Sequence, residues 1–127
     1  MKKLTPILTV DEIEPCLPFW KELGFQVTMQ VPTEDDPSKL GFAMLQSGSV
    51  ELMYQTQKSL EADLPKIAKE QLRGFLYLEV ENLAELEKRL NEMKVLVPKR
   101  KTFYGATEIV IEEAKGHIVI FAQMGAE

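Results

Sequence analysis

Residues 104–123 decide the fold, because two runs rich in β-branched residues flank a short turn in this stretch. It reads Tyr104-Gly105-Ala106-Thr107-Glu108-Ile109-Val110-Ile111-Glu112-Glu113-Ala114-Lys115-Gly116-His117-Ile118-Val119-Ile120-Phe121-Ala122-Gln123. The Lys115-Gly116 pair suits a tight turn, because glycine readily adopts the positive φ that many hairpin turns need. The stretch therefore predicts a β-hairpin that closes the chain.

The elements upstream of this hairpin repeat one order twice. The first half predicts a strand, a helix and three strands, at residues 4–10, 15–23, 25–31, 40–46 and 50–55. The second half predicts a strand over 75–80, a helix over 82–93, a strand over 95–101 and the hairpin, and Asn82 and Glu85 are spaced as in a capping box. Residues 56–72 predict one or two short connecting helices. Each half is therefore a βαβββ module, and the chain is an internal duplication.

Several motifs in this pattern resemble those of the vicinal oxygen chelate superfamily, which contains glyoxalases, bleomycin-resistance proteins and extradiol dioxygenases. Besides the hairpin, they are Pro6-Ile7-Leu8-Thr9-Val10, Phe19-Trp20-Lys21-Glu22-Leu23-Gly24-Phe25, Val50-Glu51-Leu52 and Gly74-Phe75-Leu76-Tyr77-Leu78-Glu79-Val80. The family's usual Asp-Pro-Asp-Gly turn is replaced here by Glu113-Ala114-Lys115-Gly116.

The resemblance covers nearly the whole chain and implies an α+β fold. In that family, paired βαβββ modules line a U-shaped cavity that a dimer partner usually completes. We expect one domain over residues 1–127, with a first module (1–57), a helical connector (58–72) and a second module (73–127). We also expect a homodimer.

Composition limits the partners and the compartment. The chain has 127 residues, of which 45% are hydrophobic, so it can bury a substantial core. A net charge of −5 argues against nucleic acid or an anionic membrane as the main partner. The single cysteine, Cys16, suits a reducing compartment, and no stretch approaches the roughly 18 apolar residues of a membrane span. We therefore expect a cytoplasmic protein.

The period-two alternation of the strands predicts which side chains face the helices and which face the cavity. The helix-facing set is predicted to be Leu4, Leu8, Val10, Leu52, Leu76, Leu78, Val80, Val119 and Phe121. The cavity-facing set is predicted to be Thr5, Ile7, Thr9, Glu51, Met53, Phe75, Tyr77, Glu79, Ile118 and Ile120.

Metal chemistry is disfavoured by the residues at the family's ligand positions. The resemblance places the four metal ligands of its metal-dependent members at Thr5, Glu51, Phe75 and Ile120. Only Glu51 among them has a side chain that suits a divalent ion, which needs several nitrogen or oxygen donors. The only histidine, His117, directly follows the turn. We therefore predict no metal and no cofactor, and we assign no catalytic residue.

Glu51 needs a partner, because a carboxylate on an apolar cavity wall is costly unless it is paired. It would meet either a basic ligand or an internal donor, namely Arg73, Lys99, Arg100 or a tyrosine hydroxyl. Glu79 and Glu108 carry the same two alternatives. The acidic stretch 34–37 is expected to be a solvated loop.

Aromatic side chains supply a second kind of contact. The side chains that could form a wall on which a planar ligand stacks are Phe42, Phe75, Tyr77, Phe103, Tyr104 and Trp20. Of these, Trp20 is expected in the core instead, together with Phe19. The predicted ligand-binding residues are Phe42, Glu51, Met53, Phe75, Tyr77, Tyr104, Glu108 and Ile120.

These residues favour a metal-independent protein that binds a small molecule, with sequestration of a basic or aromatic compound such as an antibiotic as one form. One alternative is a lyase, isomerase or dioxygenase of the same superfamily with a non-standard metal site, for example Glu51 with Glu79, Glu108 and His117. A further alternative is a ligand-free structural or regulatory dimer, whose cavity Met53, Phe75, Tyr77 and Ile120 would fill themselves.

Overall fold

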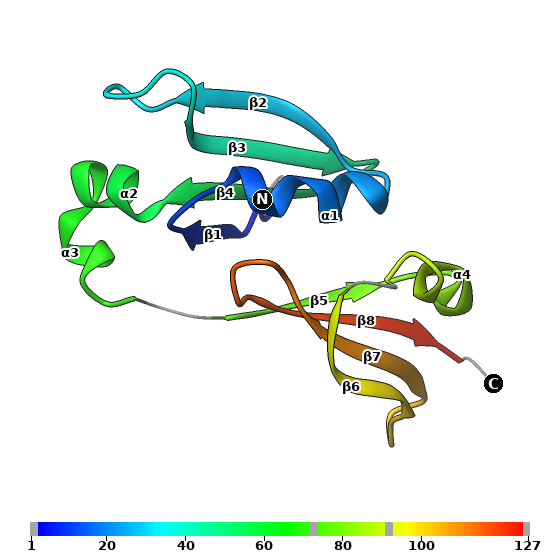
Figure 1. The fold of residues 1–127 in the computed structure, drawn as a ribbon. Helices are drawn as coiled ribbons and strands as arrows, with labels where there is room; N and C mark the ends of the chain where they lie inside the picture. The colour runs from blue at the N-terminus through cyan, green and yellow to red at the C-terminus, as the bar shows by residue number, and fades with distance from the viewer. Residues whose placement is uncertain (1–2, 72–73, 91–92, 126–127) are drawn as a thin grey trace. The chain divides into compact units, whose positions relative to one another are not determined.

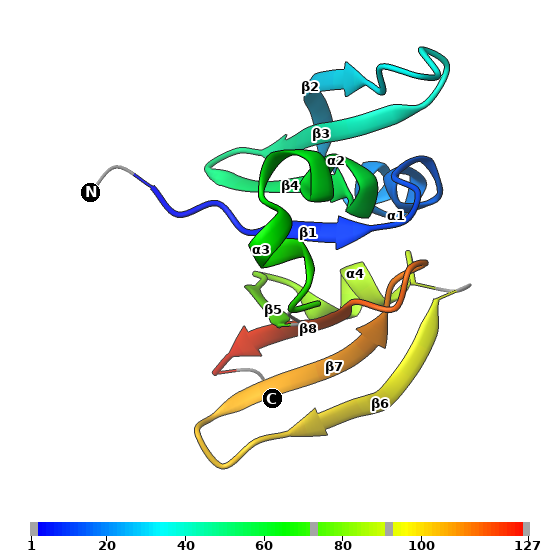
Figure 2. The ribbon, with the colours of Figure 1, turned by 90° about the vertical axis from the view of Figure 1, so that its left-hand side faces the viewer.

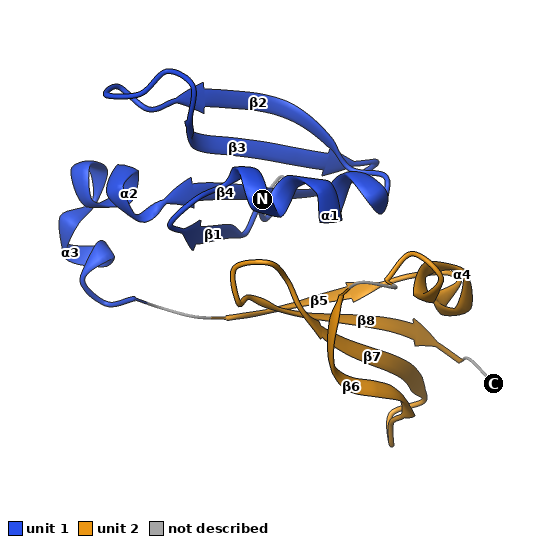
Figure 3. Cartoon of the chain, in the orientation of Figure 1, with its two compact units in different colours: residues 1–72 blue, residues 73–127 orange. Residues whose placement is uncertain are grey.

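The chain folds into two compact units, residues 1–72 and 73–127, each with its own four-stranded sheet. The computed structural model describes residues 3–71, 74–90 and 93–125. Figure 1 shows the order of the elements, and Figure 2 shows the same ribbon turned by a quarter. The helical connector predicted between the modules belongs to the first unit (Figure 3).

The first unit follows the predicted order. Its elements are β1 (Ile7–Val10), the 3₁₀ helix η1 (Glu14–Cys16), α1 (Leu17–Glu22), β2 (Gln26–Pro32), β3 (Leu40–Ser47), β4 (Val50–Thr56), α2 (Gln57–Asp63) and α3 (Pro65–Ala68). The strands lie in the order β1-β4-β3-β2, with β1 parallel to β4 and the other neighbours antiparallel.

The second unit repeats this topology. Its elements are β5 (Phe75–Glu79), α4 (Leu83–Glu87), β6 (Lys94–Lys101), β7 (Ala106–Glu112) and β8 (Ile118–Met124). The strand order is β5-β8-β7-β6, and β5 is parallel to β8 as β1 is to β4. The duplication of a βαβββ module and the α+β class are therefore confirmed.

Two elements are shorter than predicted. The predicted first strand begins only at Ile7, after Pro6, which has no N–H to donate to a sheet. The helix predicted over 82–93 ends at Glu87, although Asn82 caps it by accepting a hydrogen bond from the Glu85 N–H. After Glu87 the amides of Arg89 and Leu90 bond three residues back instead of four. Apolar residues spaced three and four apart fit both α-helical and 3₁₀-type hydrogen bonding, so the sequence could not show where the α-helix ends.

The core of the first unit lies between α1 and one face of its sheet. Trp20 is fully buried and donates a hydrogen bond of 2.8 Å from Nε1 to the hydroxyl of Tyr54. Phe19 and Phe25 pack edge-on against the Trp20 ring, at centroid distances of 4.9 and 5.0 Å. The prediction that Phe19 and Trp20 are core residues is confirmed.

The second unit uses the equivalent face. Val119 and Phe121 of β8 and Ile109 and Ile111 of β7 are buried. On the same face of β8, the Gln123 side chain accepts a hydrogen bond of 2.7 Å from the N–H of Leu83 in α4. The alternation predicted for β4 and β8 is thus confirmed, because one set of side chains meets the helix and the other points away.

We call the side of each sheet that is turned away from α1 or α4 its open face. In the first unit the open face carries Phe42 and Met44 of β3 and Glu51, Met53 and Gln55 of β4. In the second unit it carries Phe75 and Tyr77 of β5, Ile118 and Ile120 of β8, Glu108 and Val110 of β7 and Arg100 of β6. In the described part of the chain, no helix is both long and apolar enough to cross a membrane.

Candidate functional site

Glu51, on the open face of the first unit, is paired within the chain. Its side chain is only 4% exposed, and Oε2 lies 2.9 Å from Nζ of Lys3. The hydroxyl of Thr5 donates a hydrogen bond of 2.8 Å to Oε1. The hydrogen bonds from Lys3 and Thr5 hold the pKa of Glu51 below its usual value. The carboxylate is therefore ionised and satisfied without a ligand.

The internal partners predicted for Glu51 do not include the one that it has. Lys99 pairs with Glu87 at 3.0 Å, and Arg100 pairs with Glu108 at 3.3 Å. Arg73 lies outside the described residues. Lys3 is 48 residues from Glu51 in sequence, so no local spacing connects the two.

The family's metal-ligand positions do not fit a divalent ion in this chain. Glu51 is engaged by Lys3 and Thr5, and Phe75 offers no donor atom. The register of the parallel strands pairs Phe75 with Ile118, whereas the predicted ligand position on β8 is Ile120. Ile118 and Ile120 are both aliphatic, so neither can bind a metal ion. Among residues 3–71, 74–90 and 93–125, no group of three or more His, Cys, Asp or Glu side chains could hold a metal.

Glu108, on the open face of the second unit, is the centre of a polar cluster. Its side chain is 1% exposed. Tyr77 donates a hydrogen bond of 2.8 Å from its hydroxyl to Oε2, and Tyr104 donates to the same oxygen. The guanidinium of Arg100 donates from Nη2 to Oε1 at 3.3 Å. Three of the four members, Tyr77, Tyr104 and Glu108, are predicted ligand-binding residues, and the structure brings them together.

Strand register and one turn build this cluster. Arg100 of β6 lies directly opposite Glu108 of β7, and Ala122 of β8 lies on the other side of Glu108. Tyr77 pairs with Ile120, two residues before Ala122, so its hydroxyl reaches Glu108 diagonally across the sheet. Tyr104 belongs to the turn between β6 and β7, where Gly105 adopts a φ of 86° that disfavours other residues.

The cluster shifts the ionisation of its members. Burial acts to raise the pKa of Glu108, but the hydroxyls of Tyr104 and Tyr77 and the guanidinium of Arg100 outweigh it, so the pKa lies below its usual value. Burial and the neighbouring Glu108 carboxylate raise the pKa of Tyr77. Tyr77 therefore stays a neutral donor, and Glu108 stays a charged acceptor.

The aromatic rings around the cluster are accessible although their hydroxyls are engaged. Phe75 is 72% exposed, Tyr77 is 46% exposed and Tyr104 is 48% exposed. Phe103, beside Tyr104, is 99% exposed and packs edge-on against it at 5.0 Å. These exposed rings can stack on a flat apolar group or cover it.

The remaining predicted residues lie apart from this cluster. Phe42 and Met53 are half-buried on the open face of the first unit, and Ile120 is half-buried in the second unit, where it pairs with Tyr77. The sequence analysis did not predict Lys3 as a site residue. It named Arg100 and a tyrosine hydroxyl as possible internal partners of the cavity carboxylates, and the structure places Arg100, Tyr77 and Tyr104 on Glu108. With five residues, 102–106, between the paired Lys101 and Thr107, antiparallel alignment of the predicted strand 95–101 with the hairpin places Arg100 opposite Glu108.

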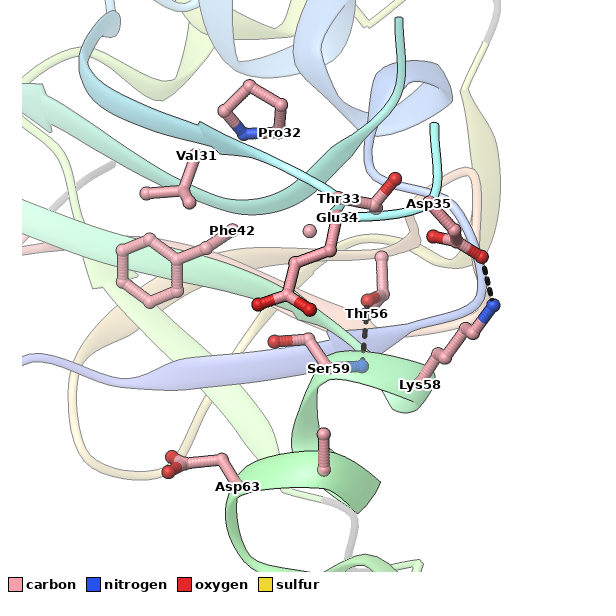
Figure 4. A pocket seen from close by; sticks show the side chains of 12 residues that line it. Val31, Pro32, Thr33, Glu34, Asp35, Phe42, Thr56, Lys58, Ser59 and Asp63 are labelled. Carbon is pink, nitrogen blue, oxygen red and sulfur yellow. Dashed lines mark hydrogen bonds and ion pairs between the residues drawn. The ribbon is translucent and has the colours of Figure 1, made fainter. Parts of the chain in front are cut away.

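A pocket of about 630 Å³ lies in the first unit, between the loop that joins β2 to β3 and helix α2 (Figure 4). Asp35 in the loop forms an ion pair with Lys58 of α2, and Thr56 caps α2 by accepting from the Ser59 N–H. The pocket is lined by Val31, Pro32, Thr33, Glu34, Asp35, Gly41, Phe42, Thr56, Lys58, Ser59, Ala62 and Asp63. The acidic stretch expected to be only a solvated loop therefore forms one wall, and Phe42 is the one predicted ligand-binding residue in the lining.

Comparison with protein families gives one match. The model of the Glyoxalase/Bleomycin resistance protein/Dioxygenase superfamily matches residues 4–121. A search of curated proteins by sequence gives no match.

Solved structures share the fold at low sequence identity. TioX from Micromonospora sp. ML1 superposes with a TM-score of 0.73 at 12% identity, covering 97% of this chain and 98% of that one. Protein PA1353 from Pseudomonas aeruginosa has a TM-score of 0.71 at 22% identity, covering 96% and 97%. A bleomycin-binding protein complexed with bleomycin has a TM-score of 0.67 at 16% identity, covering 97% and 98%. At these identities the likeness concerns the fold.

Proposed function

Because the chain belongs to the Glyoxalase/Bleomycin resistance protein/Dioxygenase superfamily, we propose that it is a metal-independent protein that binds a small aromatic molecule. The binding surface in this proposal is the open face of the second unit, around Phe75, Tyr77 and Tyr104. The ligand is held and released without being converted.

One observation carries the proposal, namely that Tyr77 and Tyr104 both donate their hydroxyls to the buried Glu108. Their polar ends are satisfied inside the chain, while about half of each side chain stays exposed. A ring fixed at one end loses little further freedom when a ligand stacks on it, so it contributes affinity at a low entropic cost. The neighbouring Phe75 adds apolar area to the same face.

Metal independence is supported by the donor set. The one carboxylate at the family's ligand positions, Glu51, already receives hydrogen bonds from Lys3 and Thr5. A metal ion would have to displace both donors. It would still lack nitrogen or oxygen ligands from β5 and β8, where Phe75 pairs with Ile118.

Sequestration is the form of binding that we favour. A structure with the same fold is a bleomycin-binding protein complexed with bleomycin, and this chain resembles it over 97% of its length. An aromatic ligand is better supported here than a basic one, because Glu51 and Glu108 already have partners in the chain. An antibiotic with an aromatic group remains one example of the class.

The test is calorimetric titration of the wild-type protein and of Phe75→Ala with indole, a neutral planar probe. We expect indole to bind the wild type, and we expect Phe75→Ala to weaken it by about fivefold, the contribution of one aromatic contact. Ile67→Ala is the matched control, since Ile67 is a 48% exposed apolar residue on α3. Equal loss in both variants, or no binding to the wild type, would overturn the proposal.

We further propose that the working form is a homodimer. Large apolar side chains outside this binding surface are also exposed, including Leu4 at 88% and Ile7 at 54%. Burial of such area against a second copy is a favourable driving force for association. Sedimentation equilibrium tests this proposal, and a monomer over the whole micromolar range would refute it.

A further inference from the structure

The open face of the second unit presents a positive charge next to its aromatic rings, although its buried charged residue is a glutamate. We infer that the site prefers an aromatic anion, a flat ring with a carboxylate or similar acidic group close to it, and that Arg100 recognises the acidic group. The inference deepens the proposed function and rests on it.

Glu108 is not accessible to a basic ligand. Its Oε2 accepts from the hydroxyls of Tyr77 and Tyr104, and its Oε1 accepts from Arg100. The side chain is 1% exposed, so these three residues shield it from solvent. A ligand ammonium would have to displace a donor from a buried carboxylate, which costs the desolvation of the displaced group.

Arg100, in contrast, has capacity left. Its side chain is 53% exposed, and one contact of 3.3 Å from Nη2 is its only hydrogen bond to another part of the described chain. A guanidinium has five N–H donors in a planar fork, so it can serve Glu108 on one side and a ligand carboxylate on the other. Because Glu108 fixes the group, the fork is oriented before a ligand arrives.

The strand that carries Arg100 adds to the positive field. Four of the eight residues of β6 are basic and none is acidic, namely Lys94, Lys99, Arg100 and Lys101. Lys94 pairs with Glu112 at 3.5 Å and Lys99 with Glu87 at 3.0 Å, so both are partly neutralised. Lys101 lies on the opposite face of β6, whereas Arg100 shares Glu108 with Tyr77 and Tyr104 and so presents its charge beside the exposed rings.

The shared carboxylate fixes the distance between charge and ring. Tyr77, Tyr104 and Arg100 all donate to Glu108, so two exposed rings and one guanidinium surround the same group. A ligand that stacks on either ring and also reaches Arg100 must carry its acidic group next to its ring. The same device occurs in the first unit, where the buried Glu51 holds Lys3, whose side chain is 63% exposed.

The experiment compares three probes with the same ring system by calorimetry, namely indole-3-acetate, neutral 3-methylindole and cationic tryptamine. We expect indole-3-acetate to bind the wild type about tenfold more tightly than 3-methylindole, the contribution of one charged hydrogen bond, and tryptamine to bind more weakly than both. The advantage of indole-3-acetate over 3-methylindole should shrink as salt is added.

Two variants connect the preference to one side chain. Arg100→Gln should abolish the advantage of indole-3-acetate, so that the ratio of its affinity to that of 3-methylindole falls to about one. Lys101→Gln is the matched control, because it removes the same charge one residue away on the opposite face of β6, and it should keep most of the advantage.

The outcomes separate this inference from the proposed function. Equal binding of all three probes, weakened by Phe75→Ala, would overturn the preference for an anion and leave the aromatic site standing. Equal loss in Arg100→Gln and Lys101→Gln would show a general charge effect and also overturn the role of Arg100. If none of the probes binds, the proposed function and the inference both fail.

Discussion

Trp20 donates a hydrogen bond of 2.8 Å from Nε1 to the hydroxyl of Tyr54, and both side chains are fully buried. The bond joins α1 to β4 inside the core of the first unit. Tyr54→Phe removes the acceptor and leaves the indole N–H buried without this partner. We expect the free energy of unfolding to fall by about 1–3 kcal/mol, as for other unsatisfied buried donors. Urea denaturation followed by circular dichroism measures it.

The double variant Trp20→Phe with Tyr54→Phe provides the control. If the hydrogen bond is the cause, the two single changes should not add, and the coupling should exceed about 0.5 kcal/mol. Additive losses would mean that each ring matters only through its packing.

A second prediction concerns acid stability. Because the pKa of Glu108 is lower in the folded chain than the usual value of about 4.3, its ionised form stabilises the fold. This stabilisation is fully present above the unfolded pKa and is lost as the pH falls through the lower folded pKa. We expect Glu108→Gln to be less stable than the wild type near pH 7, by about 1–2 kcal/mol. The difference should shrink towards about pH 3.

Urea midpoints measured at several pH values from about 7 to about 3 test this dependence. Glu61→Gln, which removes an exposed carboxylate on α2, is the control for the loss of one charge. A Glu108→Gln deficit that stays constant over the whole range would mean that ionisation of this group does not contribute.

The fold could be predicted because period-two runs and turn residues repeat along the chain. Five strands, β2 to β6, begin and end within one residue of their predicted bounds, and the two helices of the connector lie where Pro65 divides the pattern. The first strand was predicted too long, because apolar residues on both sides of Pro6 fit the pattern equally well. Helix α4 was predicted too long, since its stripe continues after the hydrogen bonding has changed.

The candidate site could be predicted only in part. Alternation placed Glu51 and Tyr77 on faces away from the helices, which is where they lie. The cations that hold the buried carboxylates could not be deduced in the same way, since Lys3 is 48 residues from Glu51. The partner of Glu108 depends on the register between β6 and β7, which two irregularities in that pair shift.

A third prediction concerns metals. Prolonged treatment with EDTA should leave the melting temperature and the binding of indole unchanged. Addition of Ni²⁺, Zn²⁺, Mn²⁺ or Fe²⁺ should give no stoichiometric binding in calorimetry, because Lys3 and Thr5 occupy the carboxylate of Glu51. Stoichiometric binding that Glu51→Gln abolishes would contradict metal independence and favour an enzyme.

A fourth prediction concerns helix α2. Thr56 is 6% exposed, and its hydroxyl accepts a hydrogen bond of 3.1 Å from the Ser59 N–H at the start of the helix. Thr56→Ala should lower the free energy of unfolding by about 1 kcal/mol, the usual contribution of such a cap. Thr56→Ser keeps the oxygen and should retain most of the stability. A Thr56→Ser loss as large as that of Thr56→Ala would assign the effect to the methyl group.

The outer strands β2 and β6 each contain a proline at or beside a break in their pairing, Pro32 and Pro98. A proline offers no N–H to an incoming strand, and Lys99 and Lys101 add charge beside Pro98. Neither sheet can therefore be extended smoothly at these edges by an extended peptide or a second copy. The edges formed by β2 and β6 are in this way protected against fibril-like stacking, even though the open faces carry exposed apolar side chains such as Phe75.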